Sequence, residues 1–188
     1  MRRTLALFAP LVVLSALVAQ LNHVLTDVRV YLFVGSLFVV FAALTQPLAA
    51  GLAAAILAGL MCDATAPLWF DPMMSVGWSL KSSALLGLAH AHTVLFALAH
   101  IVVYNVRDRI PRNDTIGRIV VALLANLGLF LAFSFMHIVH SPAPGAVWPR
   151  LIADLVCSQV FLTLVAPWFF ALQAQALVFA RVERENFA

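Results

Sequence analysis

Long apolar stretches with almost no charge inside them constrain the fold of this chain more than any other feature. Six such stretches lie at 4–21, 30–44, 47–62, 82–104, 119–135 and 151–180. A helix needs about 20 predominantly apolar residues to cross the hydrocarbon layer of a membrane. Charged residues make up 10% of the 188 residues, whereas a soluble domain contains roughly 25%. The sequence therefore predicts an all-α fold: a polytopic integral membrane protein whose six-helix transmembrane bundle forms a single domain over residues 1–188.

The positions of the basic residues predict how the six spans are oriented. If the N-terminus lies in the cytoplasm, eight arginines fall on the cytoplasmic side: Arg2, Arg3, Arg107, Arg109, Arg112, Arg118, Arg181 and Arg184. Three basic residues then fall on the outer side: Arg29, Lys81 and Arg150. Cytoplasmic segments of membrane proteins carry the excess of Lys and Arg. We therefore expect a multi-pass protein with both termini in the cytoplasm.

The outer loop predicted at 63–81 is unusually apolar for a connection between spans. It contains Trp69 and Trp78, and Trp148 falls on the same predicted side. The headgroup layer of a membrane favours indole rings, and non-helical backbone at membrane depth must be covered by protein. We therefore expect this loop to lie in the interface or to dip back into the bundle.

Small residues recur at every fourth position of the third stretch, at Gly51, Ala55 and Gly59. Small side chains let another helix approach closely, and in lipid such packing drives association. Asp63 is the next residue on the same face, at the predicted outer end of the helix. Two interpretations stay open for this stripe: a helix-packing seam within the chain, or a contact surface for a partner or polar pocket anchored by Asp63.

A second group of polar residues is predicted near the outer ends of the spans. Asp154 lies one turn into the sixth stretch, and Ser158 follows on the same side of the helix. Ionisable residues inside a span are costly and usually face the interior or a partner. With Asp63, the residues Asp71, Lys81, Arg150 and Asp154 form either an outer polar cluster or a set of plain interfacial charges.

The histidines of the fourth stretch are the remaining candidates for chemistry. His90, His92 and His100 lie on one helix, and side chains two positions apart point to different faces. No histidine is expected to face them from another helix at matching depth. This arrangement favours satisfied polar contacts or proton-sensitive groups over a metal or haem site.

Signatures of catalysis and of nucleic-acid binding are missing from the sequence. It contains no Gly-rich phosphate loop and no HExxH pattern. Its basic residues are not clustered as a phosphate-binding surface requires. We therefore predict a protein that is not an enzyme, with no cofactor, no metal site and no nucleic-acid partner.

One part of the sequence resembles a known family. Residues 47–67 contain Pro47-Leu-Ala-Ala-Gly51, then Ala58-Gly59-Leu60, and then Asp63 and Pro67. This pattern is similar to the MreD family of bacterial rod-shape-determining membrane proteins, which typically show a Gly-Leu pair, an Asp at the end of a central helix and a Pro-containing loop. The chain length, the six spans and the basic cytoplasmic ends match as well. The chain departs from the family at Leu68-Trp69-Phe70, where a glycine is common, and in its His-rich fourth helix.

The resemblance implies a non-catalytic membrane scaffold of the cell-elongation machinery in the bacterial inner membrane. Such a protein would bind an MreC-like partner and help couple MreB filaments to peptidoglycan synthesis by a RodA-type polymerase and its transpeptidase. The resemblance also implies a fold similar to the substrate-binding components of energy-coupling-factor transporters. Two alternatives follow: a substrate-binding component of a vitamin-type transporter and, less favoured, a membrane enzyme or redox protein that uses His90, His92 or His100.

Overall fold

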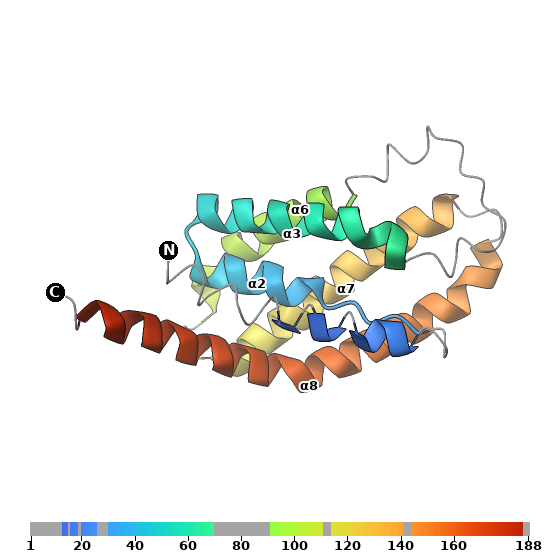
Figure 1. Ribbon diagram of the computed structural model, residues 1–188. Helices are drawn as coiled ribbons and strands as arrows, with labels where there is room; N and C mark the ends of the chain where they lie inside the picture. The colour runs from blue at the N-terminus through green and yellow to red at the C-terminus, as the bar shows by residue number, and fades with distance from the viewer. Residues whose placement is uncertain are drawn as a thin grey trace. The chain divides into compact units, whose positions relative to one another are not determined.

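The computed structural model of the protein (Figure 1) describes residues 13–14, 16–18, 20–25, 30–69, 91–110, 114–140 and 144–185. Within these ranges every regular element is a helix and no strand occurs, so the prediction of an all-α fold is confirmed. Two of the described helices contain segments long and apolar enough to cross a membrane, Thr115–Phe135 and Trp148–Leu172.

The labelled elements follow the predicted apolar stretches but differ from them at several ends. They are α2 (Gly35–Thr45), α3 (Leu48–Trp69), α6 (Ala91–Val106), the short 3-10 helix η2 (Arg107–Arg109), α7 (Thr115–His140) and α8 (Pro144–Glu185). A shorter apolar helix covers Ala16–Leu25. Both α7 and α8 run well past the predicted stretches 119–135 and 151–180. Prolines 149 and 167 lie inside α8, which bends along its length without interruption (Figure 1).

The second apolar stretch is only partly helical, which corrects the predicted span at 30–44. Residues 30–34 belong to no helix, the alternating directions of their backbone hydrogen bonds are those of an extended segment, and α2 begins at Gly35. The sequence from Val30 to Val34 is Val-Tyr-Leu-Phe-Val, a run of β-branched and aromatic residues that prefers extended backbone. With 11 residues, α2 is about 16 Å long, which is too short to cross the hydrocarbon layer by itself.

The third helix is longer than predicted, and this corrects the start of the outer loop. Residues 63–69, including Asp63 and Pro67, are helical and belong to α3. Alanines 64 and 66 favour continuation of the helix, and Pro67 lies in the last turn, where its missing N–H interrupts a single backbone hydrogen bond. The rest of the predicted loop, with Asp71 and Lys81, lies outside the described residues.

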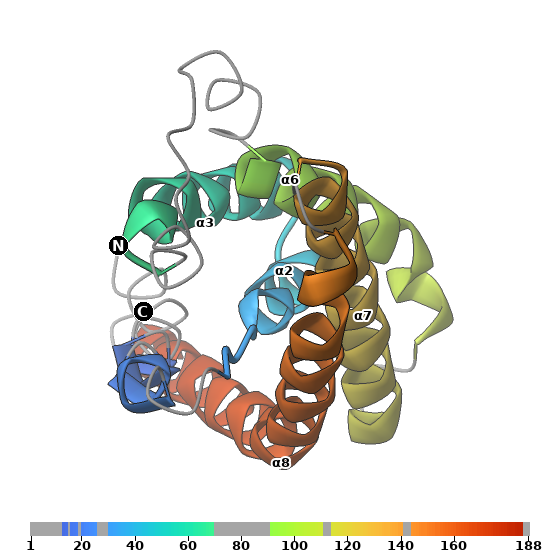
Figure 2. The ribbon, with the colours of Figure 1, turned by 90° about the vertical axis from the view of Figure 1, so that its right-hand side faces the viewer.

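The chain divides into two compact units. Unit 1 combines both ends of the chain, Met1–Val34 and Pro149–Ala188, and unit 2 is the central part, Gly35–Trp148. In unit 2, α2 contacts α3, α6 and α7 and lies on their inner side (Figure 2). Residues Ser36 to Ala43 of α2 are buried without a break, which is typical of a helix that is surrounded by others. The core of unit 2 is therefore built around the short helix α2.

Candidate functional site

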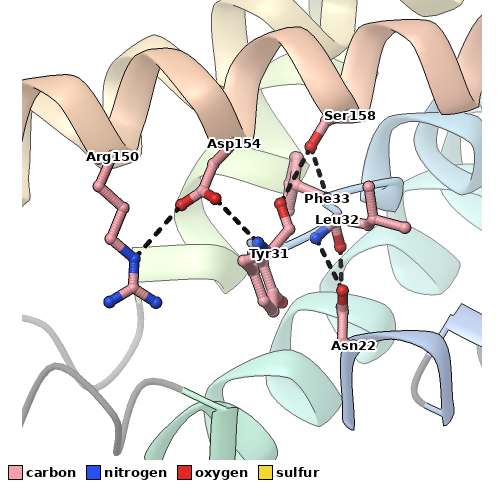
Figure 3. A network of polar contacts seen from close by, with 7 residues as sticks. All are labelled: Asn22, Tyr31, Leu32, Phe33, Arg150, Asp154 and Ser158. Carbon is pink, nitrogen blue, oxygen red and sulfur yellow. Dashed lines mark hydrogen bonds and ion pairs between the residues drawn. The ribbon is translucent and has the colours of Figure 1, made fainter. Parts of the chain in front are cut away.

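The extended segment 30–34 is the centre of a polar network in unit 1 (Figure 3). The backbone N–H of Tyr31 donates to Oδ1 of Asp154 at 2.8 Å. The N–H of Phe33 donates to Oγ of Ser158 at 2.9 Å, and that hydroxyl donates to the carbonyl oxygen of Tyr31 at 3.4 Å. Two side chains of α8 thus replace the hydrogen bonds that the segment would have made as a helix.

The opposite side of the same segment is bound by the N-terminal helix. Nδ2 of Asn22 donates to the carbonyl oxygen of Leu32 at 2.9 Å, and Leu32 N–H donates to Oδ1 of Asn22 at 2.7 Å. Successive residues of extended backbone point their polar groups to opposite sides. Residues 31 and 33 therefore face α8, and residue 32 faces Asn22. Because of this alternation, side chains from two helices form hydrogen bonds with the backbone of three consecutive residues.

The position of Asp154 follows from the pattern of α8. The residues at 154, 158, 162, 166 and 170 are all buried, so a four-residue spacing defines the inner face of the helix. Asp154 and Ser158 are its first two members, and Asp154 is only 5% exposed. Oδ2 of Asp154 lies 3.8 Å from Nε of the half-buried Arg150. A buried carboxylate needs such partners, and here they are a backbone donor at 2.8 Å and a cation at 3.8 Å.

The predicted outer polar cluster is described only in part. Arg150 and Asp154 are brought together as an ion pair. Asp63 belongs to α3, but its side chain lies outside the described residues, as do Asp71 and Lys81. The pairing of Asp154 with Ser158 on one side of the helix was visible in the sequence. Nothing in the sequence indicated that Asn22 binds backbone groups. The Val-Tyr-Leu-Phe-Val run is nevertheless a local signal for an extended segment, whose backbone groups need hydrogen-bond partners.

The small-residue stripe of α3 lies in a seam against α6 in unit 2. Gly51, Ala55 and Gly59 are all buried, and α3 packs along α6. A Cβ atom at Gly59 would meet the Cα of Thr93 and would lie 2.7 Å from its backbone nitrogen. A Cβ atom at Gly51 would meet the imidazole of His100. The stripe is therefore occupied within the chain, and a partner helix would have to displace α6 to reach it.

His100 is the most deeply buried ionisable side chain that the structure describes in unit 2. It is 0% exposed, and neither ring nitrogen has a hydrogen-bond partner with acceptable geometry, although the backbone at Val39 and Leu48 lies beside the ring. The ring centroid is 6.1 Å from that of Tyr104, and the guanidinium of Arg107 lies 3.8 Å above the Tyr104 ring. His100, Tyr104 and Arg107 therefore follow one another along one side of α6 and the start of η2, and only the guanidinium lies over a ring.

A second buried polar contact joins α2 to α7. Oγ of Ser36 donates to Oδ1 of Asn126 at 2.9 Å, and both residues are fully buried. Nδ2 of Asn126 has no hydrogen-bond partner among the residues that the structure describes. The interior of unit 2 thus contains donor and acceptor groups on His100 and Asn126 that form no hydrogen bond with the described residues.

The remaining candidate histidines do not join His100. His92 faces α7, where its ring centroid is 4.2 Å from that of Phe133, whereas His100 faces α3. His90 lies outside the described residues. Within the part of the chain that the structure describes, no group of three or more His, Cys, Asp or Glu side chains could hold a metal ion. The described polar side chains of unit 1 mostly bind backbone groups.

Comparisons of the chain with protein-family models, with curated proteins and with solved structures find no match.

Proposed function

We propose that this chain is a multi-pass protein of the bacterial inner membrane that acts as a non-catalytic scaffold of the MreD type. In this role it binds an MreC-like membrane protein and helps couple MreB filaments to peptidoglycan synthesis. The observation that carries the membrane part is the inverted polarity of the helices, whose exposed faces are apolar and whose buried faces hold the polar groups.

In unit 2, the exposed residues of α6 and α7 are more apolar than several of the buried ones. On α7, large apolar residues at 116, 120, 124, 131 and 135 are exposed, whereas Asn126 and Ser134 are buried. On α6, residues 94, 98, 102 and 106 are exposed and apolar, whereas His100 is buried. The surface helix of a soluble protein has the reverse pattern, with charged residues facing water. Lipid is the solvent that suits these faces.

The scaffold part rests on the resemblance of residues 47–67 to the MreD family and on the structural use of the described polar groups. Because α6 covers Gly51 and Gly59, the proposed partner contact moves from that stripe to an exposed face. Gly128 lies on the exposed face of α7, and a Cβ atom there would have no atom of the described residues within 4 Å. A small residue on a lipid-exposed face lets a partner helix approach closely.

The scaffold role is tested by purifying the tagged protein from its native membrane in mild detergent and identifying the co-purified proteins by mass spectrometry. We expect an MreC-like protein and a peptidoglycan synthase. Gly128→Leu should lower their recovery, whereas Val120→Leu, which also enlarges an exposed residue of α7, should leave it unchanged. Recovery of neither protein would contradict the scaffold role, and equal recovery with Gly128→Leu would contradict only the α7 contact.

The vitamin-type transporter component remains the second candidate because of the unused hydrogen-bonding groups in unit 2. His100 and Asn126 are fully buried and carry nitrogens without partners, and polar groups of this kind fix the orientation of a ligand in an apolar site. This function predicts co-purification with an ATPase pair and a membrane coupling subunit. It also predicts that one compound of a vitamin and metal screen raises the thermal stability, and that His100→Leu abolishes the rise.

A further inference from the structure

Two exposed tryptophans mark a fixed length of α8. Trp148 is 51% exposed and Trp168 is 75% exposed. They are 20 residues apart (168 − 148) on one continuous helix, which corresponds to about 30 Å at the rise of an α-helix. The hydrocarbon layer of a bilayer has about the same thickness, and indole rings are enriched in the headgroup layers on both sides of it.

Large apolar side chains dominate the exposed surface of α8 between the two tryptophans. Every fourth residue from Trp148 to Leu172 is exposed, and all of them are large and apolar: Trp148, Ile152, Val156, Val160, Leu164, Trp168 and Leu172. This series lies across the helix from the buried series that begins with Asp154 and Ser158. The two charged residues between the tryptophans, Arg150 and Asp154, pair with each other.

The exposed polar residue in this region is compatible with lipid as well. Thr163 is exposed, and its Oγ1 donates to the carbonyl oxygen of Gln159 at 2.8 Å within the same helix. A hydroxyl group in hydrocarbon must find a partner inside the protein, because no water is present to bind it. On a face that met water, this internal bond would bring no comparable advantage.

We infer that α8 carries a lipid-facing band whose borders with the two headgroup layers lie at Trp148 and Trp168. The partner is a phospholipid bilayer of ordinary thickness, and Val156 and Val160 face its centre. Ser158, which binds the extended segment, then lies at the level of the bilayer centre, and Asp154 lies about 9 Å inside the outer border. The 17 residues from Phe169 to Glu185 extend beyond the inner border by about 25 Å.

This inference rests on the membrane part of the proposed function and is independent of the scaffold role. It is tested with the full-length protein in phosphatidylcholine vesicles whose acyl chains carry bromine either near the headgroups or near the bilayer centre. Bromine quenches the fluorescence of nearby indoles. Three variants each contain one tryptophan: two retain Trp148 or Trp168, with the other three of the four native tryptophans replaced by phenylalanine, and the third contains Val160→Trp alone.

We expect shallow bromine to quench Trp148 and Trp168 at least about twofold more than deep bromine, as for residues at the interface. The order should reverse for Val160→Trp. Stronger deep quenching of Trp168 would overturn the proposed border. Quenching of Trp168 without quenching of Val160→Trp would mean that protein, and not lipid, covers the band.

The failures of the two proposals are distinguishable. If the protein does not float with the vesicles in a density gradient, the proposed membrane function fails. If it floats but the quenching order is wrong, only the assignment of the borders fails.

A second experiment applies if the tryptophan replacements prevent folding. Val160→Cys and Val178→Cys are introduced one at a time into a chain with Cys62→Ala and Cys157→Ala. A membrane-impermeant maleimide applied to inside-out vesicles should label position 178 and not position 160, and equal labelling would overturn the inference.

Discussion

In unit 1, three side chains bind the backbone of an extended segment, whereas in unit 2 two glycines of α3 leave room for α6, for its backbone at Gly59 and for the imidazole of His100 at Gly51. Asn22, Asp154 and Ser158 supply hydrogen bonds that the segment cannot make by itself. Gly51 and Gly59 supply only room. The comparison shows that polar side chains replace the missing backbone hydrogen bonds where the helix is broken, and that glycine allows close packing where α3 and α6 are intact.

The largest effect is expected at the seam. In Gly59→Leu the new side chain meets the backbone of Thr93, which cannot move out of the way as a flexible side chain would. We expect α3 and α6 to separate and the free energy of unfolding to fall by about 3 kcal/mol. Unfolding in detergent, followed by circular dichroism during a denaturant titration, measures the loss. Gly128→Leu is the matched control, with an expected change below about 0.5 kcal/mol, and a similar loss in both variants would disprove the seam.

The next effect concerns the buried carboxylate of unit 1. Asp154→Ala leaves the N–H of Tyr31 without an acceptor and Arg150 without its partner. We expect a loss of about 2–3 kcal/mol in the free energy of unfolding. Asp154→Asn retains an acceptor oxygen and loses only the ion pair at 3.8 Å, so its loss should be clearly smaller. If both substitutions cost the same, the ion pair and not the backbone bond is what stabilises the segment.

A smaller loss is expected for each of the other two residues that bind the segment. Asn22→Ala and Ser158→Ala each remove bonds to neighbouring residues of the same backbone, and each should cost about 1–2 kcal/mol. Because the two side chains stabilise one segment, the double variant should lose less than the sum of the single losses. A denaturant titration of the four proteins measures the coupling. Strict additivity would show that the segment does not unfold as one piece.

The smallest effect on stability is expected at His100, a buried polar side chain of unit 2. Neither ring nitrogen has a hydrogen-bond partner in the described part of the chain, so His100→Leu removes no bond that the structure shows and fills a similar volume. We expect the free energy of unfolding to change by less than about 1 kcal/mol. Thermal unfolding in detergent provides the measurement. A loss above about 2 kcal/mol would show that the imidazole bonds to the backbone at Val39 or Leu48.

The sequence allowed parts of both units to be predicted, because some signals are local. The spacing of Asp154 and Ser158 placed them on one side of a helix, and the spacing of Gly51 and Gly59 defined a stripe. What lies opposite a stripe depends on a helix distant in the chain, and no local pattern indicates that α6 covers it. The extended segment escaped prediction because apolar composition alone does not distinguish a helix from buried extended backbone.

The measurement that tests the central claim most directly is extraction of the protein from its native membranes with alkaline carbonate and, separately, with mild detergent. Carbonate strips proteins that are held by charge or by other proteins, whereas a protein with several spans stays in the lipid. Our account predicts that the chain remains in the carbonate pellet and is released only by detergent. Release by carbonate would contradict a multi-pass membrane protein, and with it the lipid-facing band of α8.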